Sequence, residues 1–429
     1  MKKVHFLGIG GSGTSAVAKI AEAQGFKITG CDLDIDNEFT TGFKKDQLFI
    51  GHSPKHLENI DILAITPAIY SLNPDNPELL EAKKKGIEIL TWQEFMGKYL
   101  EKGKFVIAVC GTHGKSTTTA MIGKILEDAG LDPTVELGAI VPEWGTNYRV
   151  GQSQYFVTEA DEFNDNFLTS HPDITVVTTI EMDHPEYFKD FETYKGSFGK
   201  FLGQTKEKII ANLSDKGVTE VLALHTGSHS RCVGTVINYS KILIDFPLKI
   251  PGGFNILNAS AAFQVGLALG IEPKIIKKSL EKFTGIGRRF EYLGETRGAK
   301  IYSDFGHHPT EIKLTLETAR MEFPEKKITI IFQPHMFSRT KALFDDFVNV
   351  LKKAPVDEIF ILDIYPSREV DTGLVTSKQL VEAINETNVI YIPENKILEK
   401  VESEPEKYDI LFFLGAGNTH NLAKELLKD

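Results

Sequence analysis

Residues 105–120, FVIAVCGTHGKSTTTA, constrain the fold most, because they join an apolar strand, a glycine loop and a helix start. Gly111 and Gly114 free the backbone to turn its N–H groups inward, as in loops that bind phosphates. Lys115 is placed to reach the β- and γ-phosphates, and the Ser116 hydroxyl is placed to ligate Mg²⁺. The segment therefore predicts a site for a nucleoside triphosphate.

The loop is a shortened variant, since Val109 stands where the strict pattern has a glycine five residues before Gly114. The alternative is a strand-to-helix connection that carries a lysine but binds nothing. Strand, loop and threonine-rich first turn occur in the expected order, which favours the nucleotide site. His113 is a further candidate contact, although loop histidines are more often solvent-exposed. The predicted nucleotide-binding residues here are Gly111, Thr112, His113, Gly114, Lys115, Ser116 and Thr117.

Length and composition limit the class of protein. A chain of 429 residues is too long for one ordinary core and fits two or three domains. The net charge of −11 argues against binding to nucleic acid or to an anionic membrane, since both would require a basic surface. No run of apolar residues approaches the roughly 18 that a membrane-spanning helix needs. Cys31, Cys110 and Cys232 lack any CxxC spacing, which argues against disulfides or structural zinc and indicates a reducing cytoplasm.

The first 65 residues predict a βαβ unit, with strands at 4–7, 26–31 and 60–65 and a helix at 14–23. The turn after the first strand, GIGGSG at 8–13, is a complete GxGxxG pattern, and Asp32 follows about 20 residues later. The pattern indicates a pyrophosphate near a helix N-terminus without identifying the ligand. NAD, a UDP-sugar and a turn without any ligand all remain open. The predicted binding residues are Gly10, Gly11, Ser12, Gly13 and Asp32.

Two further α/β domains follow. A polar stretch at 96–104 precedes the second, and glycines near 285–289 precede the third. Apolar runs predict strands at 155–159, 174–180, 209–212, 300–303, 328–332, 358–363, 389–392 and 410–414, with an Ala-rich helix at 257–269. The predicted fold is α/β with three domains: a Rossmann-like domain at 1–100, a P-loop ATPase domain with a mostly parallel sheet at 101–287, and a second Rossmann-like domain at 288–429.

Acidic side chains follow two strands of the predicted central sheet. Glu159 and Asp161 come after one strand, and Asp183 and His184 come after another. Open α/β sheets bind ligands at the carboxyl ends of their strands. Each acid alone is more often a solvated loop charge, but beside a triphosphate Glu159 and His184 are candidate Mg²⁺ ligands.

Further polar residues mark helix starts and strand ends. Asn255 and Asn258 lie three apart at a probable helix start, so that both amides can face one ligand, although Asn255 could instead be an N-cap. Arg289 follows a glycine hinge and could reach a phosphate, or be plain surface charge. Polar residues also follow strands of the third domain, among them Asp304, His307, His308, His335 and Arg339. The histidines lack zinc spacing and are better interpreted as substrate contacts.

Taken together, these segments closely resemble the Mur ligase family. The segments that carry the resemblance, in the family's order, are GIGGSG, GTHGKST, EADE, IEMDH, PGGFNILNA, GIGRRFE, DFGHHPTEI, FQPHMFSRT, DIYPSRE and GAGN. The resemblance implies an N-terminal domain that binds UDP-N-acetylmuramate, a central ATPase and a C-terminal domain that helps to bind an amino acid. It also implies that ATP activates the lactyl carboxylate as an acyl phosphate, to which L-alanine is joined in peptidoglycan precursor synthesis.

The resemblance also implies residue roles. Lys115 and Ser116 match the ATP loop, Glu159 and His184 match Mg²⁺ sites, with Ser116 as a further metal ligand, and Asn255 and Asn258 match adenine-side contacts. The residues expected to be catalytic are Lys115, Glu159, His184, Arg289 and Asp304, and Arg289 also contacts ATP. The residues expected to bind substrate are those of the first glycine loop, Asp32, His52, His307, His308, His335 and Arg339. We expect a cytoplasmic monomer or weak homodimer without nucleic-acid or membrane partners.

The sequence departs from the family pattern in four places. Phe254 stands where a histidine is usual, and Phe305 stands where a tyrosine is usual. Pro185 is uncommon at its position, and the segment 212–251 is shorter than in typical members. The nearest alternative is a sister ligase that recycles a peptide onto UDP-N-acetylmuramate. The DFGHHPTEI and DIYPSRE segments favour the amino-acid enzyme. A nicotinamide-dependent dehydrogenase would leave Lys115 unexplained, and a non-catalytic nucleotide-binding module would leave the polar strand ends unexplained.

Overall fold

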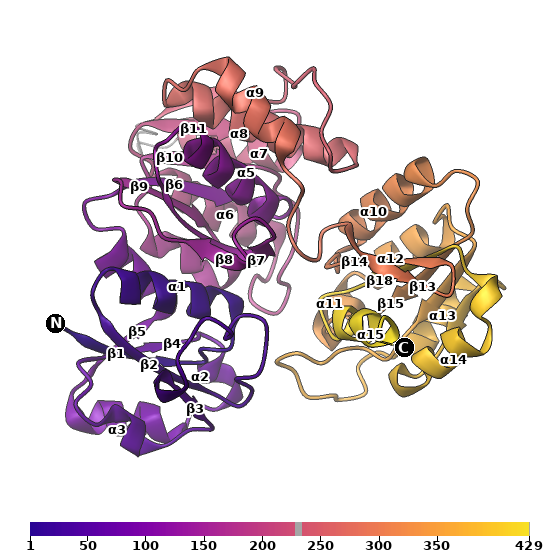
Figure 1. Cartoon of the computed structure of the whole chain (residues 1–429), viewed down its shortest axis with the longest axis horizontal. Helices are drawn as coiled ribbons and strands as arrows, with labels where there is room; N and C mark the ends of the chain where they lie inside the picture. The colour runs from indigo at the N-terminus through magenta and orange to yellow at the C-terminus, as the bar shows by residue number, and fades with distance from the viewer. Residues whose placement is uncertain (228–233, 429) are drawn as a thin grey trace. The chain divides into compact units, whose positions relative to one another are not determined.

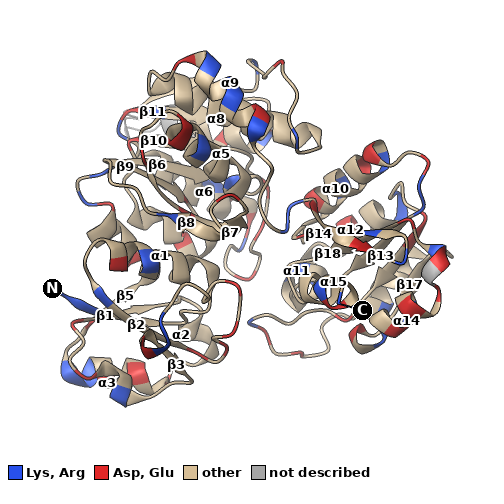
Figure 2. Ribbon diagram, in the orientation of Figure 1, with Lys and Arg blue, Asp and Glu red and all other residues tan. Residues whose placement is uncertain are grey.

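A computed structural model describes residues 1–227 and 234–428 (Figure 1). Cys232, one of the three cysteines considered above, lies outside the described residues. The chain divides into two compact units: Met1–Glu181, Phe191–Leu248 and Ile256–Thr284 form the first, and Met182–Asp190, Lys249–Asn255 and Gly285–Asp429 form the second. In the described residues no helix is long and apolar enough to cross a bilayer. Lysines and arginines are interspersed with aspartates and glutamates along both units (Figure 2).

The first unit begins with a parallel five-stranded sheet in the order β3-β2-β1-β4-β5. Its strands are β1 (Lys3–Leu7), β2 (Lys27–Asp32), β3 (Leu48–Ile50), β4 (Ile62–Ile65) and β5 (Glu88–Thr91). Its helices are α1 (Ser12–Ala23), α2 (Ile69–Leu72), α3 (Pro77–Lys85) and α4 (Trp92–Phe95), with short 3₁₀ turns η1 (Lys45–Gln47) and η2 (Pro54–Leu57). The predicted βαβ start is confirmed, and β3 and β5 extend the sheet at its two edges.

The second sheet of this unit has seven strands in the order β12-β11-β10-β6-β9-β7-β8 and is parallel except for the β7–β8 pair. Its strands are β6 (Phe105–Cys110), β7 (Thr134–Val141), β8 (Thr146–Arg149), β9 (Tyr155–Glu159), β10 (Ile174–Val177), β11 (Lys208–Ala211) and β12 (Thr235–Asn238). The helical segments are α5 (Lys115–Asp128), η4 (Phe163–Thr169), α6 (Phe191–Leu202), α7 (Lys216–Gly227), α8 (Gly253–Ala268) and α9 (Pro273–Lys282).

One apolar core joins these two sheets. The segment predicted as a polar connection at 96–104 begins with a π-helix, η3 (Met96–Leu100), and both Met96 and Leu100 are buried. They pack with Phe6 of the first sheet and with Val106 and Phe156 of the second. The prediction of a polar linker was wrong here, because apolar side chains four residues apart share one helical face and are buried despite charged neighbours.

The second unit contains a six-stranded sheet in the order β13-β14-β18-β15-β16-β17, parallel except for the β13–β14 pair. Its strands are β13 (Glu291–Thr296), β14 (Ala299–Asp304), β15 (Ile328–Phe332), β16 (Glu358–Ile361), β17 (Val389–Tyr391) and β18 (Ile410–Leu414). Its helical segments are α10 (Pro309–Glu322), α11 (Phe337–Ala342), α12 (Phe344–Lys352), α13 (Ser377–Ile384), η5 (Glu394–Lys396), α14 (Ile397–Ser403), η6 (Pro405–Lys407) and α15 (Thr419–Leu426). The predicted α/β class with three mostly parallel sheets is confirmed.

Candidate active site

The loop between β6 and α5 has a backbone that only glycine adopts without strain. Gly111 has a φ of +129° and Gly114 a φ of +81°. A Cβ at Gly111 would lie 2.1 Å from Thr178 Oγ1, and one at Gly114 would lie 2.4 Å from Asn258 Oδ1. The loop therefore packs tightly against its surroundings, and the amide of Asn258, a predicted nucleotide contact, lies against the loop.

Thr112 and His113 tie the loop to the segment that follows β10. The Thr112 hydroxyl accepts a hydrogen bond from the Glu181 backbone N–H at 3.0 Å and lies 3.1 Å from the Tyr194 hydroxyl. The His113 Nε2 atom contacts the Glu181 carboxylate. The structure thus places His113, a predicted phosphate contact, beside an acidic side chain.

Lys115 is held by acidic and carbonyl oxygens. Its ammonium donates to the Gly111 carbonyl at 2.6 Å and to Glu162 Oε2 at 3.0 Å, while the Tyr194 hydroxyl donates to Glu162 Oε1 at 3.0 Å. Burial alone would lower the pKa of Lys115, but the nearby carboxylates of Glu162, Glu159 and Asp161 raise it. Lys115 is therefore positively charged, at the point where the glycine loop meets α5.

Glu162 is a partner that the sequence reasoning missed. It is fully buried and holds the lysine that would bind phosphate. The signal was present, because Glu162 belongs to the same acidic cluster as Glu159. Only the fold, however, shows which member of the cluster faces Lys115.

Glu159 and Ser116 offer oxygen atoms near the loop. Glu159 ends β9, which pairs with β6, and its Oε2 atom accepts from the Gly138 backbone N–H at 2.9 Å. Ser116 lies in the first turn of α5. Asp161 turns toward its own loop, where Oδ1 accepts from the Phe163 N–H at 3.2 Å. A carboxylate and a hydroxyl are donors that suit Mg²⁺, so Glu159 and Ser116 fit the predicted metal.

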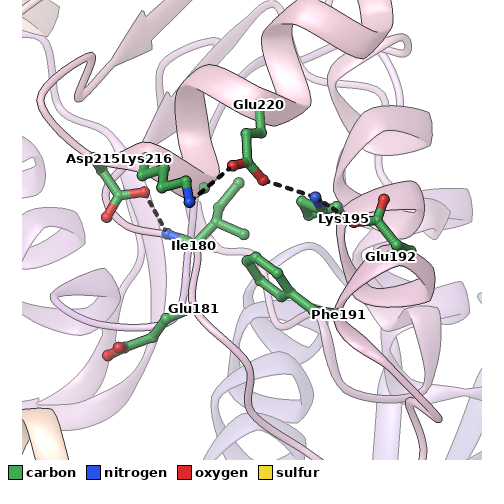
Figure 3. Close-up of a pocket in the computed structure, with 9 residues that line it drawn as sticks. Ile180, Glu181, Phe191, Glu192, Lys195, Asp215, Lys216 and Glu220 are labelled. Carbon is green, nitrogen blue, oxygen red and sulfur yellow. Dashed lines mark hydrogen bonds and ion pairs between the residues drawn. The ribbon is translucent and has the colours of Figure 1, made fainter.

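A cavity of about 490 Å³ borders this region (Figure 3). Glu181, the partner of His113, lies in its wall. The other charged side chains there largely pair with one another: Lys195 bonds Glu220 at 2.7 Å, and Asp215 Oδ1 accepts from a backbone N–H at 3.2 Å. The two lysines pair with the carboxylates of Glu192 and Glu220, so Glu181 and Asp215 leave the cavity wall with a net negative charge.

The first glycine loop, between β1 and α1, is closed by Asp32. Asp32 Oδ2 accepts from the Gly10 N–H at 2.9 Å, and Oδ1 accepts from the Leu33 N–H at 2.7 Å. A Cβ at Gly10 would lie 2.6 Å from the Asp34 carbonyl oxygen, and one at Gly13 would lie 2.5 Å from the Trp92 ring. The Asp32 carboxylate, a predicted ligand contact, therefore also holds the loop backbone.

The remaining predicted residues of this loop lie at the start of α1. The helix begins at Ser12, directly after Gly11, which is its N-cap. Ser12 accepts a hydrogen bond from the Asn147 amide through its carbonyl oxygen at 2.6 Å. His52, a predicted substrate contact outside this loop, follows β3 in the sequence. Its Nδ1 atom lies 3.3 Å from the Cys31 sulfur.

In the second unit, a buried ion pair joins Asp183 to Arg339. The arginine donates to Asp183 Oδ1 from Nε at 3.1 Å and from Nη2 at 3.0 Å. Burial would raise the pKa of Asp183, but His184, Arg339 and two further histidines hold it well below its usual range. Arg339, a predicted substrate contact, thus has one carboxylate partner within its own unit.

His184 adopts a left-handed backbone with a φ of +54°, uncommon for a residue other than glycine. Its N–H donates to Asp183 Oδ1 at 2.7 Å, and its Nδ1 lies 3.3 Å from Glu186 Oε1. Arg368 contacts the same Glu186 carboxylate. Imidazole is a poorer donor for Mg²⁺ than oxygen, so His184 fits this metal less well than Glu159 does.

The histidines at the strand ends of the second unit are kept neutral. Burial, and then Arg339, lowers the pKa of His335 to about 3 and the pKa of His307 well below its usual value. The two rings lie 5.8 Å apart, and His335 stacks on Tyr365. His308 caps α10 by accepting from the Thr310 N–H at 3.3 Å.

Asp304 and Arg289 both have polar partners within the second unit. Asp304 is buried, which raises its pKa, and it accepts from the Gly306 N–H at 2.7 Å and the Phe290 N–H at 2.8 Å. Arg289 bonds Glu311 Oε1 at 3.0 Å, and its guanidinium lies 5.4 Å from the Phe305 ring centre. The unusual phenylalanine thus supplies an aromatic face for a cation.

Asn255, the other predicted adenine contact, lies at the start of α8. Its side-chain amide donates to the Pro251 carbonyl at 2.6 Å. Because α8 begins at Gly253, Asn255 lies within the helix and is not its N-cap. The alternative interpretation of Asn255 as an N-cap was therefore wrong.

Three family models together cover most of the chain. Residues 3–103 match the Mur ligase family, catalytic domain; residues 109–266 match the Mur ligase middle domain; and residues 288–417 match the Mur ligase, glutamate ligase domain. The chain belongs to the Mur ligase family. It is accordingly an enzyme of the ligase class, as the motifs in its sequence predict.

Similar proteins share this organisation over their whole length. The chain is 39% identical to a UDP-N-acetylmuramate--L-alanine ligase of Caldicellulosiruptor saccharolyticus, covering 100% of this chain and 99% of the relative. It is 37% identical to the enzyme of that name from Acetivibrio thermocellus, and the match covers 100% of this chain and 96% of the relative. The solved UDP-N-acetylmuramate-alanine ligase of Thermotoga maritima is 26% identical with a TM-score of 0.80, covering 100% and 99%. A murein peptide ligase of Psychrobacter arcticus shares the fold at 20% identity and a TM-score of 0.73.

Proposed function

We propose that this chain joins L-alanine to the lactyl carboxylate of UDP-N-acetylmuramate, with hydrolysis of ATP to ADP and phosphate, in the cytoplasmic synthesis of peptidoglycan precursors. The observation that carries the proposal is full-length similarity to ligases of that name, at 35–39% identity. The charged lysine in a tight glycine loop supports it, because this is the group that an ATP-dependent step requires.

In the proposed reaction the lactyl carboxylate attacks the γ-phosphorus of ATP, and the bond to ADP breaks. The amine of L-alanine then attacks the acyl carbon, and phosphate leaves as the amide forms. Lys115 binds the β- and γ-phosphates and offsets their charge, and the backbone N–H groups of the loop orient them. Mg²⁺ held by the Glu159 carboxylate and the Ser116 hydroxyl would neutralise further phosphate charge, and His184 would be a ligand of a separate Mg²⁺ ion.

The N-terminal glycine loop would bind the UDP portion of the sugar substrate. Its N–H groups lie at the start of α1, where a diphosphate is favoured by the helix dipole. In the second unit, Arg339 and the histidines His307, His308 and His335 would receive the amino acid and the muramyl carboxylate. The lowered pKa of His307 and of His335 makes both imidazoles weak bases, so they suit hydrogen bonding to substrate rather than removal of the ammonium proton.

Phosphate release tests the proposal. The purified chain is incubated with ATP, Mg²⁺ and UDP-N-acetylmuramate, and L-alanine, glycine, L-serine and a free tripeptide are compared as acceptors. We expect release to require an acceptor and to be fastest with L-alanine. Faster release with the tripeptide would instead identify a peptide-recycling ligase, and no stimulation by any acceptor would refute the ligase proposal.

A further inference from the structure

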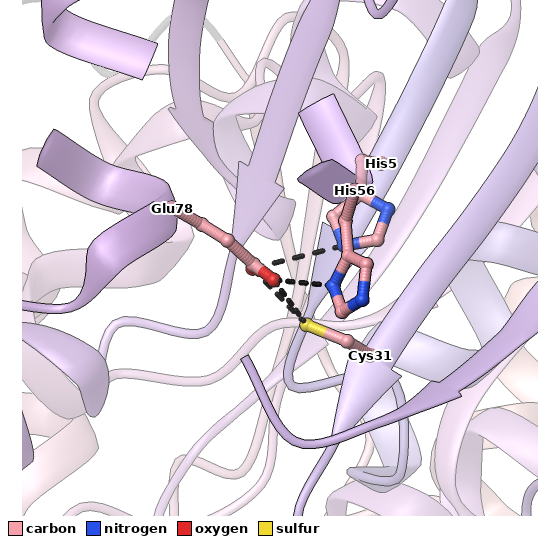
Figure 4. Close-up of side chains that lie close together, drawn as sticks. All are labelled: His5, Cys31, His56 and Glu78. Carbon is pink, nitrogen blue, oxygen red and sulfur yellow. Dashed lines mark hydrogen bonds and ion pairs between the residues drawn. The ribbon is translucent and has the colours of Figure 1, made fainter. Parts of the chain in front are cut away.

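Four metal-ligating side chains meet inside the N-terminal part of the first unit (Figure 4). His5 comes from β1, Cys31 from the end of β2, His56 from η2 and Glu78 from the start of α3. One ligand atom of each lies within 4.8 Å of all the others. His5, Cys31 and Glu78 are fully buried, and His56 is partly exposed.

The distances suit a tetrahedral ion after small side-chain shifts. Cys31 Sγ lies 3.1 Å from Glu78 Oε2, His56 Nδ1 lies 2.7 Å from Glu78 Oε1, and His5 Nε2 lies 3.7 Å from Glu78 Oε2. Zinc–ligand bonds of about 2.0–2.3 Å place neighbouring ligand atoms roughly 3.3–3.8 Å apart. The Cys31–Glu78 and His5–Glu78 separations lie in or near that range, and the shorter His56–Glu78 contact would lengthen when an ion binds.

His5 gives an independent sign that the cluster is built for a ligand. Its Nε2 atom is buried without a hydrogen-bond partner and faces the cluster, while Nδ1 lies 2.8 Å from the Thr29 hydroxyl. With the Nδ1 proton donated to Thr29, Nε2 presents a lone pair, the arrangement typical of a metal-bound histidine.

Glu78 gives a second sign, because no lysine or arginine of the described residues pairs with its carboxylate. In the described part of the chain its ion pairs are with His5, His52 and His56. A buried carboxylate is costly unless a positive charge compensates it. A divalent cation at the centre of the four side chains would provide that charge.

We propose that His5, Cys31, His56 and Glu78 bind one divalent transition-metal ion, with Zn²⁺ as the best match. Two nitrogens, one sulfur and one oxygen form a borderline-soft ligand set, whereas Mg²⁺ and Ca²⁺ prefer oxygen alone. Binding releases the Cys31 thiol proton to solvent and leaves a thiolate on the metal. The ion enters from the side of His52 and His56, whose side chains are 15% and 13% exposed.

The proposed site differs from what the cysteine spacing predicts. Cys31 and Glu78 are 47 residues apart, and the four proposed ligands come from four separate elements. No short sequence motif therefore identifies the site. The ion would tie β1, β2, η2 and α3 together directly beside Asp32, which closes the first glycine loop. The inference is independent of the proposed ligase function.

Cobalt provides a direct test, because Co²⁺ bound to a thiolate has a charge-transfer band in the near ultraviolet. The full chain is stripped with a chelator, kept in excess Mg²⁺ to occupy oxygen-ligand sites, and titrated with Co²⁺. We expect one equivalent to give this band together with the visible bands of tetrahedral cobalt, and Zn²⁺ to displace it. Absence of the charge-transfer band in the folded chain would overturn the proposal.

Variants assign the site. Cys31→Ser should abolish the charge-transfer band, whereas Cys110→Ser, which removes another buried thiol, should retain it. A band that survives in folded Cys31→Ser would overturn the proposal. If circular dichroism shows that Cys31→Ser does not fold, His56→Gln decides. We expect its Co²⁺ affinity to fall by more than about tenfold, the loss typical even of an outer-shell partner, and an unchanged affinity would contradict the assignment.

Discussion

The first unit contains two glycine loops that follow parallel strands and precede helices, yet they differ in charge. The loop at 111–116 presents Lys115, which neighbouring carboxylates keep charged. The loop at 8–13 has no cationic side chain, and the Asp32 carboxylate is used to hold the Gly10 backbone. A triphosphate requires a cation for its terminal phosphates, whereas a diphosphate can be bound by N–H groups at a helix start. This difference supports the proposal that ATP binds at the second loop and the UDP-sugar at the first.

Removing the cation of the second loop should have the largest effect. We expect Lys115→Ala to lower kcat of the proposed ligase by about 10³-fold, because the loop loses the charge that stabilises the transferring phosphoryl group. Steady-state phosphate release measures this. A variant that retains more than a tenth of wild-type kcat would contradict the role of Lys115.

Stability can be changed near the second loop without touching either ligand, which separates binding effects from folding effects. Glu101 precedes β6, accepts from Ser170 at 2.8 Å, and burial raises its pKa from 4.5 to about 7. Between these pH values the folded chain keeps a proton that the unfolded chain loses, so stability falls as pH rises. Glu101→Gln removes this loss, and its stability relative to wild type should grow by roughly 3 kcal/mol between pH 4 and pH 8.

Chemical unfolding of Glu101→Gln and wild type at several pH values checks this expectation. Glu399→Gln, an exposed acid whose side chain is 74% accessible, serves as the matched control and should show no such trend. A stability difference for Glu101→Gln that is the same at pH 4 and pH 8 would show that Glu101 ionises normally in the folded chain.

The first loop should be sensitive to added volume. A Cβ at Gly10 would lie 2.6 Å from the Asp34 carbonyl and 2.9 Å from Asp32 Oδ2, so Gly10→Ala must displace the loop. Overpacking of this kind costs about 1–3 kcal/mol, and we expect KM for UDP-N-acetylmuramate to rise roughly 10- to 100-fold. KM for ATP should change less than twofold. Equal increases in both values would contradict separate loops for the two nucleotides.

A glycine outside the loops provides the smallest expected effect. Gly196 lies in α6, is exposed, and a Cβ there would meet no atom within 4 Å. Gly196→Ala should stabilise the helix by up to about 1 kcal/mol, because alanine has the higher helix propensity. Thermal unfolding measures the gain. Destabilisation would show that glycine-to-alanine changes in this unit are harmful in general, which would weaken the interpretation of Gly10→Ala.

Much of the fold could be predicted because its signals are local. Two buried strands of the third sheet, Ile328–Phe332 and Ile410–Leu414, match their predicted bounds, since continuous apolar runs are typical of strands covered on both faces. Both glycine loops also follow predicted strands and precede predicted helices. The short strands β3 and β5 were missed, because three or four residues at a sheet edge carry little periodic signal.

The contacts between distant residues could not be predicted from the sequence. The Lys115–Glu162 pair depends on how β9 lies beside β6, and the Asp183–Arg339 pair joins residues 156 positions apart. The cluster around Glu78 is the clearest example, because each of its members has an ordinary local explanation as a strand or helix residue. Only the packing of the four elements shows that their ligand atoms converge.

Binding measured separately for the two nucleotides tests the central claim most directly. Calorimetry of UDP-N-acetylmuramate and of a non-hydrolysable ATP analogue is compared for wild type, Lys115→Ala and Gly10→Ala. We predict that Lys115→Ala loses affinity for the ATP analogue alone and that Gly10→Ala loses affinity for UDP-N-acetylmuramate alone. Parallel loss of both ligands in either folded variant would contradict the assignment of one nucleotide to each glycine loop.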